Sequence, residues 1–217
     1  MKIGILGTGI VGNTLGTRLV QLGNQVKMGS RTADNNKAAL WITAAGKGAS
    51  QVTFADAVKF GEIIFNCTNG KVSIEALNLA GKENLKEKIL IDLSNPLDFS
   101  KGMPPTLTVS NTDSLGEQIQ RAFPETKVVK TLNTLNCEVM LNPKLVNNGD
   151  HDIFLSGNDA EAKQKVKELL KTCGWKEEHL LDIGDITSAR GTEMILPLWV
   201  RLMGTFGTAK FQFKVVN

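Results

Sequence analysis

The sequence predicts an α/β protein: a Rossmann-type, doubly wound and mostly parallel sheet with a small C-terminal βαβα extension. Two observations carry this prediction. Short apolar segments alternate with amphipathic helical segments along most of the chain, which is the order that a parallel sheet covered by helices requires. A glycine-rich turn, which runs from Gly7 to Gly12 and reads Gly-Thr-Gly-Ile-Val-Gly, follows the first apolar segment and opens the first helical one.

The first βαβ unit occupies about thirty residues, a usual length for this motif. Residues 2–6 are the first predicted strand and residues 25–28 the second. Four apolar residues between them recur at spacings of four, four and three, which places them on one face of a helix: Val11, Leu15, Leu19 and Leu22. Gly23 and Asn24, which tolerate the left-handed conformation, end that helix.

The same alternation continues to residue 132. Further strands are predicted at 51–54, 62–67, 88–92 and 127–132, and helices at 37–45, 55–60, 73–80 and 114–123. The segment 98–111 contains Gly102, Pro104 and Pro105, so it is predicted as a loop.

The chain divides near residue 150. Residues 1–150 are predicted to form the dinucleotide-binding domain, and residues 151–217 a small extension that packs on the same sheet and counts with it as one domain, 1–217. The extension has strands at 152–155 and 180–183 and an alternating segment at 210–216 that reads as an edge strand. Asn158 and Glu161 resemble a capping box at the start of one helix, and Thr187 or Ser188 starts another, which Pro197 should kink.

The composition excludes several classes of protein. Of 217 residues, 41% are hydrophobic and 22% charged, which rules out a disordered tail, a collagen-like fibre and a low-complexity spacer. The net charge is only +3 and the lysines are scattered among acidic residues, so we expect no nucleic-acid partner. No apolar run is long enough to span a bilayer, so we expect no membrane partner either.

The three cysteines, Cys67, Cys137 and Cys173, are far apart and show no CxxC spacing. They predict neither a disulfide framework nor a metal site, and they fit a reducing, cytoplasmic location.

The glycine-rich turn has the context of a dinucleotide site, with a strand before it and a helix after it. Gly7 permits the tight turn, Gly9 lets the backbone approach a pyrophosphate, and Gly12 lets the helix pack closely on the strand. The free amides of Gly9, Ile10 and Val11 would point at the phosphates from a helix N-terminus. The predicted cofactor-binding residues of this turn are Gly7, Thr8, Gly9, Ile10, Val11 and Gly12.

The end of the second strand favours NADP over NAD. NAD enzymes usually have a carboxylate there, whereas this chain has Ser30, Arg31 and Thr32, and its next carboxylate is Asp34. A guanidinium flanked by hydroxyls would bind a 2′-phosphate, which a carboxylate would repel. We therefore predict Arg31 as the main anchor, Ser30 and Thr32 as donors, and Lys37 as an assisting cation.

Three further strand ends should line the nicotinamide side, because ligands bind at the carboxyl ends of parallel strands. Their residues are Cys67, Thr68 and Asn69, then Asn95 and Pro96, then Asn133 and Thr134. These groups are small and neutral, so they suit a carboxamide and a ribose better than acid–base chemistry. For each of them, a role as a turn or capping residue stays an equal alternative.

Several segments together resemble the NADP oxidoreductases that depend on the deazaflavin coenzyme F420. They are residues 2–12, 29–31, 92–97, 127–134 and 156–159. The cytoplasmic reductase domains of six-transmembrane metalloreductases share that fold. The resemblance covers nearly the whole chain and implies hydride transfer between NADPH and a small-molecule acceptor: coenzyme F420, FAD or FMN. It also implies NADP-binding roles for residues 8–11 and 30–32, and places residues 67–69 in the family's nicotinamide-proximal loop.

The chain offers few acid–base groups for reducing a ketone or an imine, which needs a proton donor. It has no tyrosine, and its two histidines, His151 and His179, read as surface residues. Hydride transfer to a flavin ring needs mainly stacked placement and dryness, so we predict no catalytic side chain. A non-catalytic NADPH sensor and a small-carbonyl reductase are the alternatives.

An apolar stripe on the last helix has three possible roles. It consists of Met194, Trp199, Met203 and Phe206. The stripe would wall the acceptor pocket, form the interface of a homodimer, or pack in the core.

Overall fold

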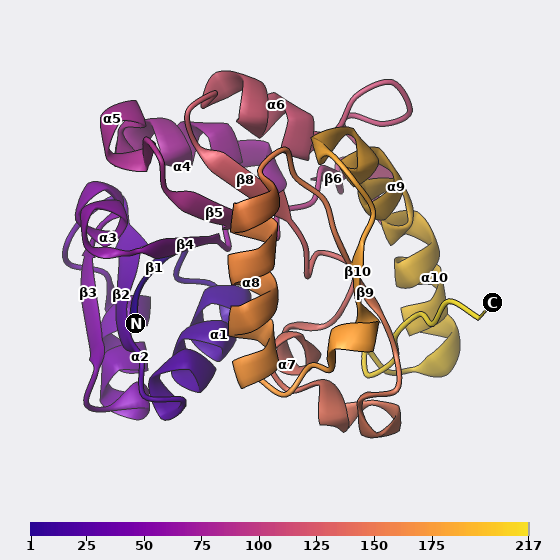
Figure 1. The fold of residues 1–217 in the computed structure, drawn as a ribbon, viewed down its shortest axis with the longest axis horizontal. Coiled ribbons are helices and arrows are strands. Elements are labelled where there is room, and N and C mark those ends of the chain that lie inside the picture. The colour runs from indigo at the N-terminus through magenta and orange to yellow at the C-terminus, as the bar shows by residue number, and fades with distance from the viewer. Residues whose placement is uncertain (217) are drawn as a thin grey trace.

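The computed structural model describes residues 1–216 and has the predicted doubly wound α/β architecture (Figure 1). Its central sheet has six strands in the order β3-β2-β1-β4-β5-β8, and every neighbouring pair is parallel. The strands are β1 (Lys2–Leu6), β2 (Gln25–Ser30), β3 (Ala49–Thr53), β4 (Ile63–Asn66), β5 (Ile89–Asp92) and β8 (Lys127–Lys130). This order reverses direction beside β1, which puts a crevice at the carboxyl ends of the strands on either side of it.

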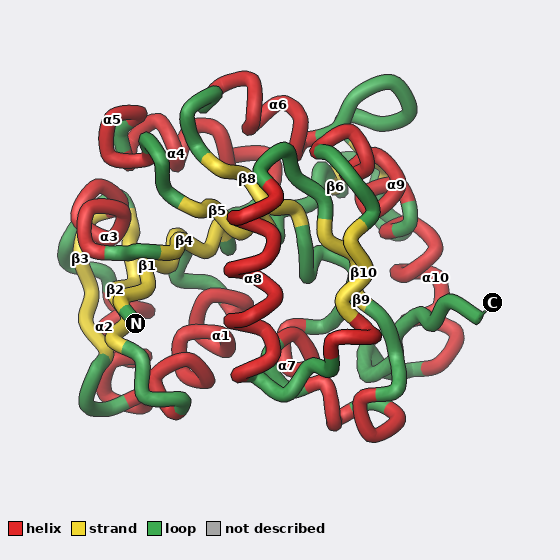
Figure 2. Tube along the Cα trace, viewed as in Figure 1, coloured by secondary structure: helices red, strands yellow, loops and turns green. Residues whose placement is uncertain are grey.

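Helices cover both faces of the sheet (Figures 1 and 2). On one face lie α1 (Ile10–Gln21), α2 (Asn36–Ala45) and α8 (Ala160–Thr172). On the other lie α3 (Phe54–Phe60), α4 (Ser73–Ala80), α5 (Lys82–Leu85) and α6 (Leu115–Ala122). Successive strand residues therefore enter different cores: Ile3 and Ile5 pack under α1, and Leu6 packs under α3 and α4. Strands buried on both faces read as continuous apolar runs, which is why they were recognisable in the sequence.

The remaining elements are short. β6 (Leu97–Asp98) and β7 (Thr106–Leu107) pair as an antiparallel hairpin that begins one residue before the predicted loop 98–111 and otherwise lies within it. The others are α7 (Cys137–Met140), β9 (Ile153–Leu155), β10 (Leu180–Asp182), α9 (Ala189–Met194), α10 (Leu196–Phe206) and the 3-10 turns η1 (Gly70–Val72), η2 (Pro143–Leu145), η3 (Asn147–Gly149), η4 (Glu177–His179) and η5 (Ile186–Ser188).

The C-terminal extension follows the βαβα order, and its strands pair mainly with each other. β9 and β10 form a two-stranded parallel sheet, and one bridge between Lys130 and Ser156 links them to β8. Through its apolar face, α8 packs on the six-stranded sheet. The division of the chain at residue 150 stays a prediction.

The ends of the C-terminal helices differ from expectation. The N-cap of α8 is Asp159 rather than the predicted Asn158. The Asp159 side chain accepts from Ala162 N at 2.7 Å, whereas the Asn158 side chain accepts from Ile186 N at 3.1 Å. The last helix is broken at Ile195 rather than kinked, so that Pro197 falls in the first turn of α10, where its missing N–H leaves no hydrogen bond unmade.

The predicted edge strand at 210–216 is wrong. This segment has no strand among the described residues, and its Phe213 carbonyl accepts from the amide of Asp152, the residue before β9, at 3.0 Å. Its side chains hold it instead: Phe211 stacks on Trp199 with ring centroids 5.1 Å apart. The alternation does not produce a buried face, since Phe211 packs on α10 while Val215 is exposed.

The prediction that both histidines lie at the surface is also wrong. His151 is 2% exposed, packs edge-on against Trp175 and bonds the Pro143 carbonyl at 2.9 Å through Nε2. His179 is 7% exposed and bonds Asp152 at 2.7 Å through Nδ1. Both neighbourhoods come from residues distant in sequence, so local polarity was misleading.

The apolar stripe is not a core feature along its whole length, since Met194 and Phe206 are 41% and 56% exposed. A homodimer through this face stays a prediction. Within residues 1–216, no helix combines the length and the apolar character that crossing a bilayer would need.

Candidate cofactor site

A cavity of about 720 Å³ opens at the carboxyl ends of β1, β2 and β4. This volume lies within the usual range for small-molecule and cofactor sites. Ten of the sixteen predicted cofactor residues line it: Gly7, Thr8, Gly9, Ser30, Arg31, Thr32, Lys37, Cys67, Thr68 and Asn69. The fold therefore brings together the glycine-rich turn, the end of the second strand and the end of the fourth.

The glycine-rich turn is shaped to receive a ligand. Gly7 has φ +114°, and a Cβ on Gly12 would lie 2.1 Å from the Gly7 carbonyl oxygen, so the turn and the helix require glycine there. A Cβ on Gly9 would meet nothing within 4 Å. Gly9 is also the N-cap of α1, and neither a capping side chain nor an acidic residue occupies the first turn. The first amides of α1 therefore face open space, which suits a diphosphate.

Positive charge stands beside this turn. Arg31 and Lys37 line the cavity, and neither forms an ion pair within residues 1–216. The Ser30 hydroxyl donates to the Thr32 carbonyl at 2.5 Å, and the Thr32 hydroxyl donates to the Asp34 carbonyl at 2.9 Å. The two cations are thus the groups that are open to a phosphate, while the two hydroxyls order the loop that carries Arg31.

Six predicted residues lie outside this cavity. Ile10, Val11 and Gly12 belong to the first turn of α1, where Ile10 is 79% exposed and offers only its backbone. Asn95 and Asn133 are hydrogen-bonded to each other. Asn95 Nδ2 donates to the Asn133 backbone carbonyl and Asn133 Nδ2 donates to Asn95 Oδ1, both at 2.9 Å. Asn133 also donates to the Thr192 carbonyl at 2.9 Å, so its donors tie α9 to the sheet. Pro96 is buried beside this pair.

Cys67 has no catalytic role that its environment supports. Burial, with a smaller effect from Asp92, raises the pKa of its thiol far above the ordinary value. The thiolate is the reactive form of cysteine, so this side chain is a neutral wall of the cavity at physiological pH.

Sequence reasoning missed one wall of the cavity. It is formed by α3, α4 and the turn before α4: Phe54, Val72, Glu75, Ala76 and Leu79. These residues carry no motif, and only the packing of α4 on α3, which itself lies against β2, brings them to the site. Leu79, whose side chain is 53% exposed, gives this wall an apolar surface that a bound ligand could cover.

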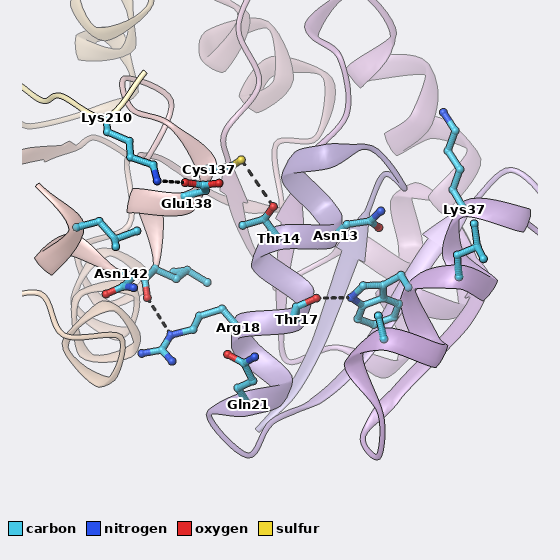
Figure 3. A pocket seen from close by; sticks show the side chains of 15 residues that line it. Asn13, Thr14, Thr17, Arg18, Gln21, Lys37, Cys137, Glu138, Asn142 and Lys210 are labelled. Carbon is cyan, nitrogen blue, oxygen red and sulfur yellow. Dashed lines mark hydrogen bonds and ion pairs between the residues drawn. The ribbon is translucent and has the colours of Figure 1, made fainter. Parts of the chain in front are cut away.

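A second cavity of about 730 Å³ lies on the other side of α1 (Figure 3). It lies between α1, α2 and α7, and its charged side chains do not converge: Lys37 points away from Arg18, and Lys210 pairs with Glu138 at 3.0 Å. Arg18 donates to the Leu141 carbonyl at 3.2 Å. Since the glycine-rich turn opens into the first cavity, we take that one as the cofactor site, although the second is as large.

Gly9 allows a clean test of ligand approach. We expect Gly9→Ala to raise the Kd for NADPH about tenfold. The new methyl group would keep the diphosphate from one of the backbone amides at the start of α1 that are expected to bind it. The free energy of unfolding should fall by less than about 1 kcal/mol, since the methyl group meets no protein atom. Titration calorimetry and thermal unfolding measure the two quantities.

Gly204→Ala is the matched control, because a Cβ there also meets nothing within 4 Å and the residue lies in α10. It should leave the Kd unchanged. Equal NADPH affinity of the Gly9→Ala variant and the parent would contradict the proposed path of the diphosphate.

Comparison with known proteins gives a consistent picture. Residues 2–96 match the family described as NADP oxidoreductase, coenzyme F420-dependent. Over 211 residues the chain is 31% identical to the F420-dependent NADP reductase of Methanocaldococcus jannaschii, which covers 93% of this chain and 92% of that protein.

The chain spans only part of one further relative and the whole of another. It is 32% identical over 204 residues to the metalloreductase STEAP3 of Rattus norvegicus, which is 91% of this chain but only 38% of that protein. It also superimposes with a TM-score of 0.94 on the crystal structure of a provisionally assigned F420-dependent NADP reductase from Arthrobacter sp. FB24, at 51% identity over the whole of both chains.

Proposed function

The chain belongs to the coenzyme F420-dependent NADP oxidoreductase family and is an NADP-dependent oxidoreductase; from this premise we propose that it transfers a hydride between NADPH and a deazaflavin or flavin acceptor. Coenzyme F420, FAD and FMN are the candidate acceptors. The observation that carries the proposal is the cavity that the glycine-rich turn before α1 shares with Arg31 and Lys37, two cations with no ion pair within residues 1–216, while the end of β2 has no carboxylate.

The residues of the cavity divide the work of binding. The amides at the start of α1 would hold the diphosphate, because the helix dipole and the open N–H groups favour an anion there. Arg31 would hold the 2′-phosphate with Lys37 as a second cation. Thr68 and Asn69 would contact the uncharged part of the cofactor at the end of β4. When bound, NADPH supplies the hydride.

The chain's own acid–base groups favour a flavin-type acceptor over a carbonyl. A carbonyl reductase needs a proton donor at the acceptor. The sequence has no tyrosine, and the histidines are buried against Pro143 and Asp152 rather than in the cavity. The Cys67 thiol is held neutral by burial. Two further titratable side chains line the cavity: Lys37, which is assigned to the 2′-phosphate, and Glu75, which is exposed on α4. The role proposed for this chain is therefore to orient the cofactor and to exclude water, which is sufficient for hydride transfer between stacked rings.

An acceptor panel tests this proposal. Purified protein is mixed anaerobically with NADPH and with F420, FAD, FMN or a set of small ketones and imines, and the loss of NADPH absorbance is followed. We expect turnover with at least one of the three ring acceptors and none with the carbonyl set.

Two results would overturn the proposal, and each points elsewhere. NADPH binding without turnover of any acceptor would favour a sensor. Turnover of carbonyls alone would favour a small-carbonyl reductase.

A further inference from the structure

A cluster of three charged side chains lies buried at the carboxyl ends of β5 and β8. The Nζ of Lys130 lies 2.8 Å from Asp92 Oδ2 and 2.8 Å from Glu193 Oε1, and these side chains are 0%, 0% and 2% exposed. The third N–H of Lys130 donates to the Ser94 carbonyl. Burial opposes the charge of Lys130, but the two carboxylates outweigh that effect and raise its pKa, so the ammonium is retained.

This cluster is connected to the cofactor cavity by side-chain hydrogen bonds. Asp92 Oδ1 accepts from Asn66 Nδ2 at 2.8 Å, and Asn66 Oδ1 accepts from the Thr68 hydroxyl at 2.6 Å. The Thr68 amide also points at Asn66 Oδ1, at 3.3 Å. Thr68 lines the cavity, whereas Asn66 is fully buried at the end of β4.

The chemistry of each group fixes the direction of these bonds. The Asp92 carboxylate has no proton and can only accept, and it accepts from Lys130 and Ser94 as well as from Asn66. The amide group of Asn66 must therefore turn its NH2 toward Asp92 and its oxygen toward Thr68. A carbonyl oxygen can only accept, so the hydroxyl proton of Thr68 is committed to Asn66.

Thr68 is left with acceptor capacity alone. Its hydroxyl lies 2.8 Å from the Ser73 hydroxyl, and Ser73 must be the donor there, because the Thr68 proton is already used. A hydroxyl oxygen has two lone pairs, so one remains for a ligand in the cavity. Phosphate oxygens at neutral pH bring no proton to such a group, whereas ribose hydroxyls and a carboxamide N–H do.

We propose that Asp92, held by Lys130, is a positioning residue that fixes Thr68 as a hydrogen-bond acceptor, so that this wall of the cavity takes a hydroxyl or amide N–H of the nucleotide and not a phosphate. The inference rests on the proposed binding of NADPH in this cavity. Phosphates are then left to the amides of α1 and to Arg31 on the neighbouring strand ends, which keeps the cofactor in one register.

Asp92→Asn should reverse this polarity. The new amide keeps its oxygen toward Lys130 and presents its NH2 to Asn66, so Asn66 turns over and donates to the Thr68 hydroxyl. The backbone amides of Ser94 and Thr68, which donate at 3.2 and 3.3 Å to the two oxygens replaced in this way, lose those acceptors. The Thr68 proton is then free to face the cavity. Lys130 and Glu193 remain a matched ion pair in this variant, which favours folding.

A double-mutant cycle on the Kd for NADPH tests the relay. We expect Asp92→Asn and Thr68→Val each to weaken binding about three- to tenfold, the effect of one uncharged hydrogen bond. The two changes together should weaken it no more than the larger single effect, since both remove the same acceptor. Thr68→Ser should bind like the parent. Thr43→Val is the matched control on an exposed face of α2, where the hydroxyl donates to Ala39 O at 3.2 Å, and it should leave the Kd unchanged.

Several outcomes would overturn the relay. Effects of Asp92→Asn and Thr68→Val that multiply would show that Asp92 acts by another route, and a Thr68→Val variant with parental affinity would remove Thr68 from binding. If Asp92→Asn does not fold, Asn66→Ala replaces it in the cycle with the same expected non-additivity. A parent that binds no NADPH overturns the proposed function too, whereas a silent acceptor panel with a non-additive cycle leaves the relay standing.

Discussion

Arg31→Ala is expected to weaken NADPH binding about ten- to 150-fold. A hydrogen bond between charged groups contributes about 1.5–3 kcal/mol, and every 1.4 kcal/mol corresponds to tenfold in Kd. Arg31 lines the cavity and has no acidic partner within residues 1–216, so removing it costs no ion pair of the free protein. The affinity for NADH, which lacks the 2′-phosphate, should change by less than about twofold.

The measurement is titration of both cofactors into the parent and the variant. Arg121→Ala is the matched control: Arg121 pairs with Asp113 at 2.7 Å on α6, and its loss should leave both affinities unchanged. A parent protein that binds NADPH and NADH equally would contradict the assignment of Arg31, because a residue that binds the 2′-phosphate must make the protein prefer NADPH.

The central sheet and ten of the sixteen residues that line the candidate site were predictable because their signals are local. The Gly7 to Gly12 turn carries its strand and helix beside it in sequence, and Arg31 follows directly on β2. A parallel sheet then brings strand ends together at one edge whatever the intervening sequence, which is why Thr68 could be placed in the same cavity.

The residues that were missed or misjudged depend on partners far along the chain. His179 looked exposed in a run of Lys and Glu, yet it is buried because Asp152, 27 residues away, accepts its hydrogen bond. The charged ends of β5 and β8 resembled ordinary strand ends, and Glu193 arrives on α9 only through the tertiary fold. A polar residue can be buried where its partner satisfies it, and sequence periodicity contains no record of that partner.

The buried position of Lys130 predicts the largest effect on stability. Lys130→Met keeps the length of the side chain but leaves Asp92 and Glu193 facing each other without their cation. Removing one partner of a fully buried ion pair costs about 3–5 kcal/mol, because an uncompensated charge stays in the interior. We expect the free energy of unfolding, measured by denaturant titration, to fall by that amount.

Two comparisons separate this charge effect from a general loss of packing. Lys127→Met makes the same change on the first residue of β8, where the side chain is 31% exposed and pairs with Glu87 and Asp159 at 3.4 Å, so the loss of stability should be much smaller than for Lys130→Met. Lys130→Met combined with Asp92→Asn and Glu193→Gln removes all three charges and should recover part of the lost stability.

Glu193 also accepts from the first amides of α6, Leu115 N at 2.8 Å and Gly116 N at 2.9 Å, and the single amide oxygen of glutamine can serve only part of that role. A triple variant less stable than Lys130→Met would therefore show that capping of α6, rather than charge balance, dominates the cluster.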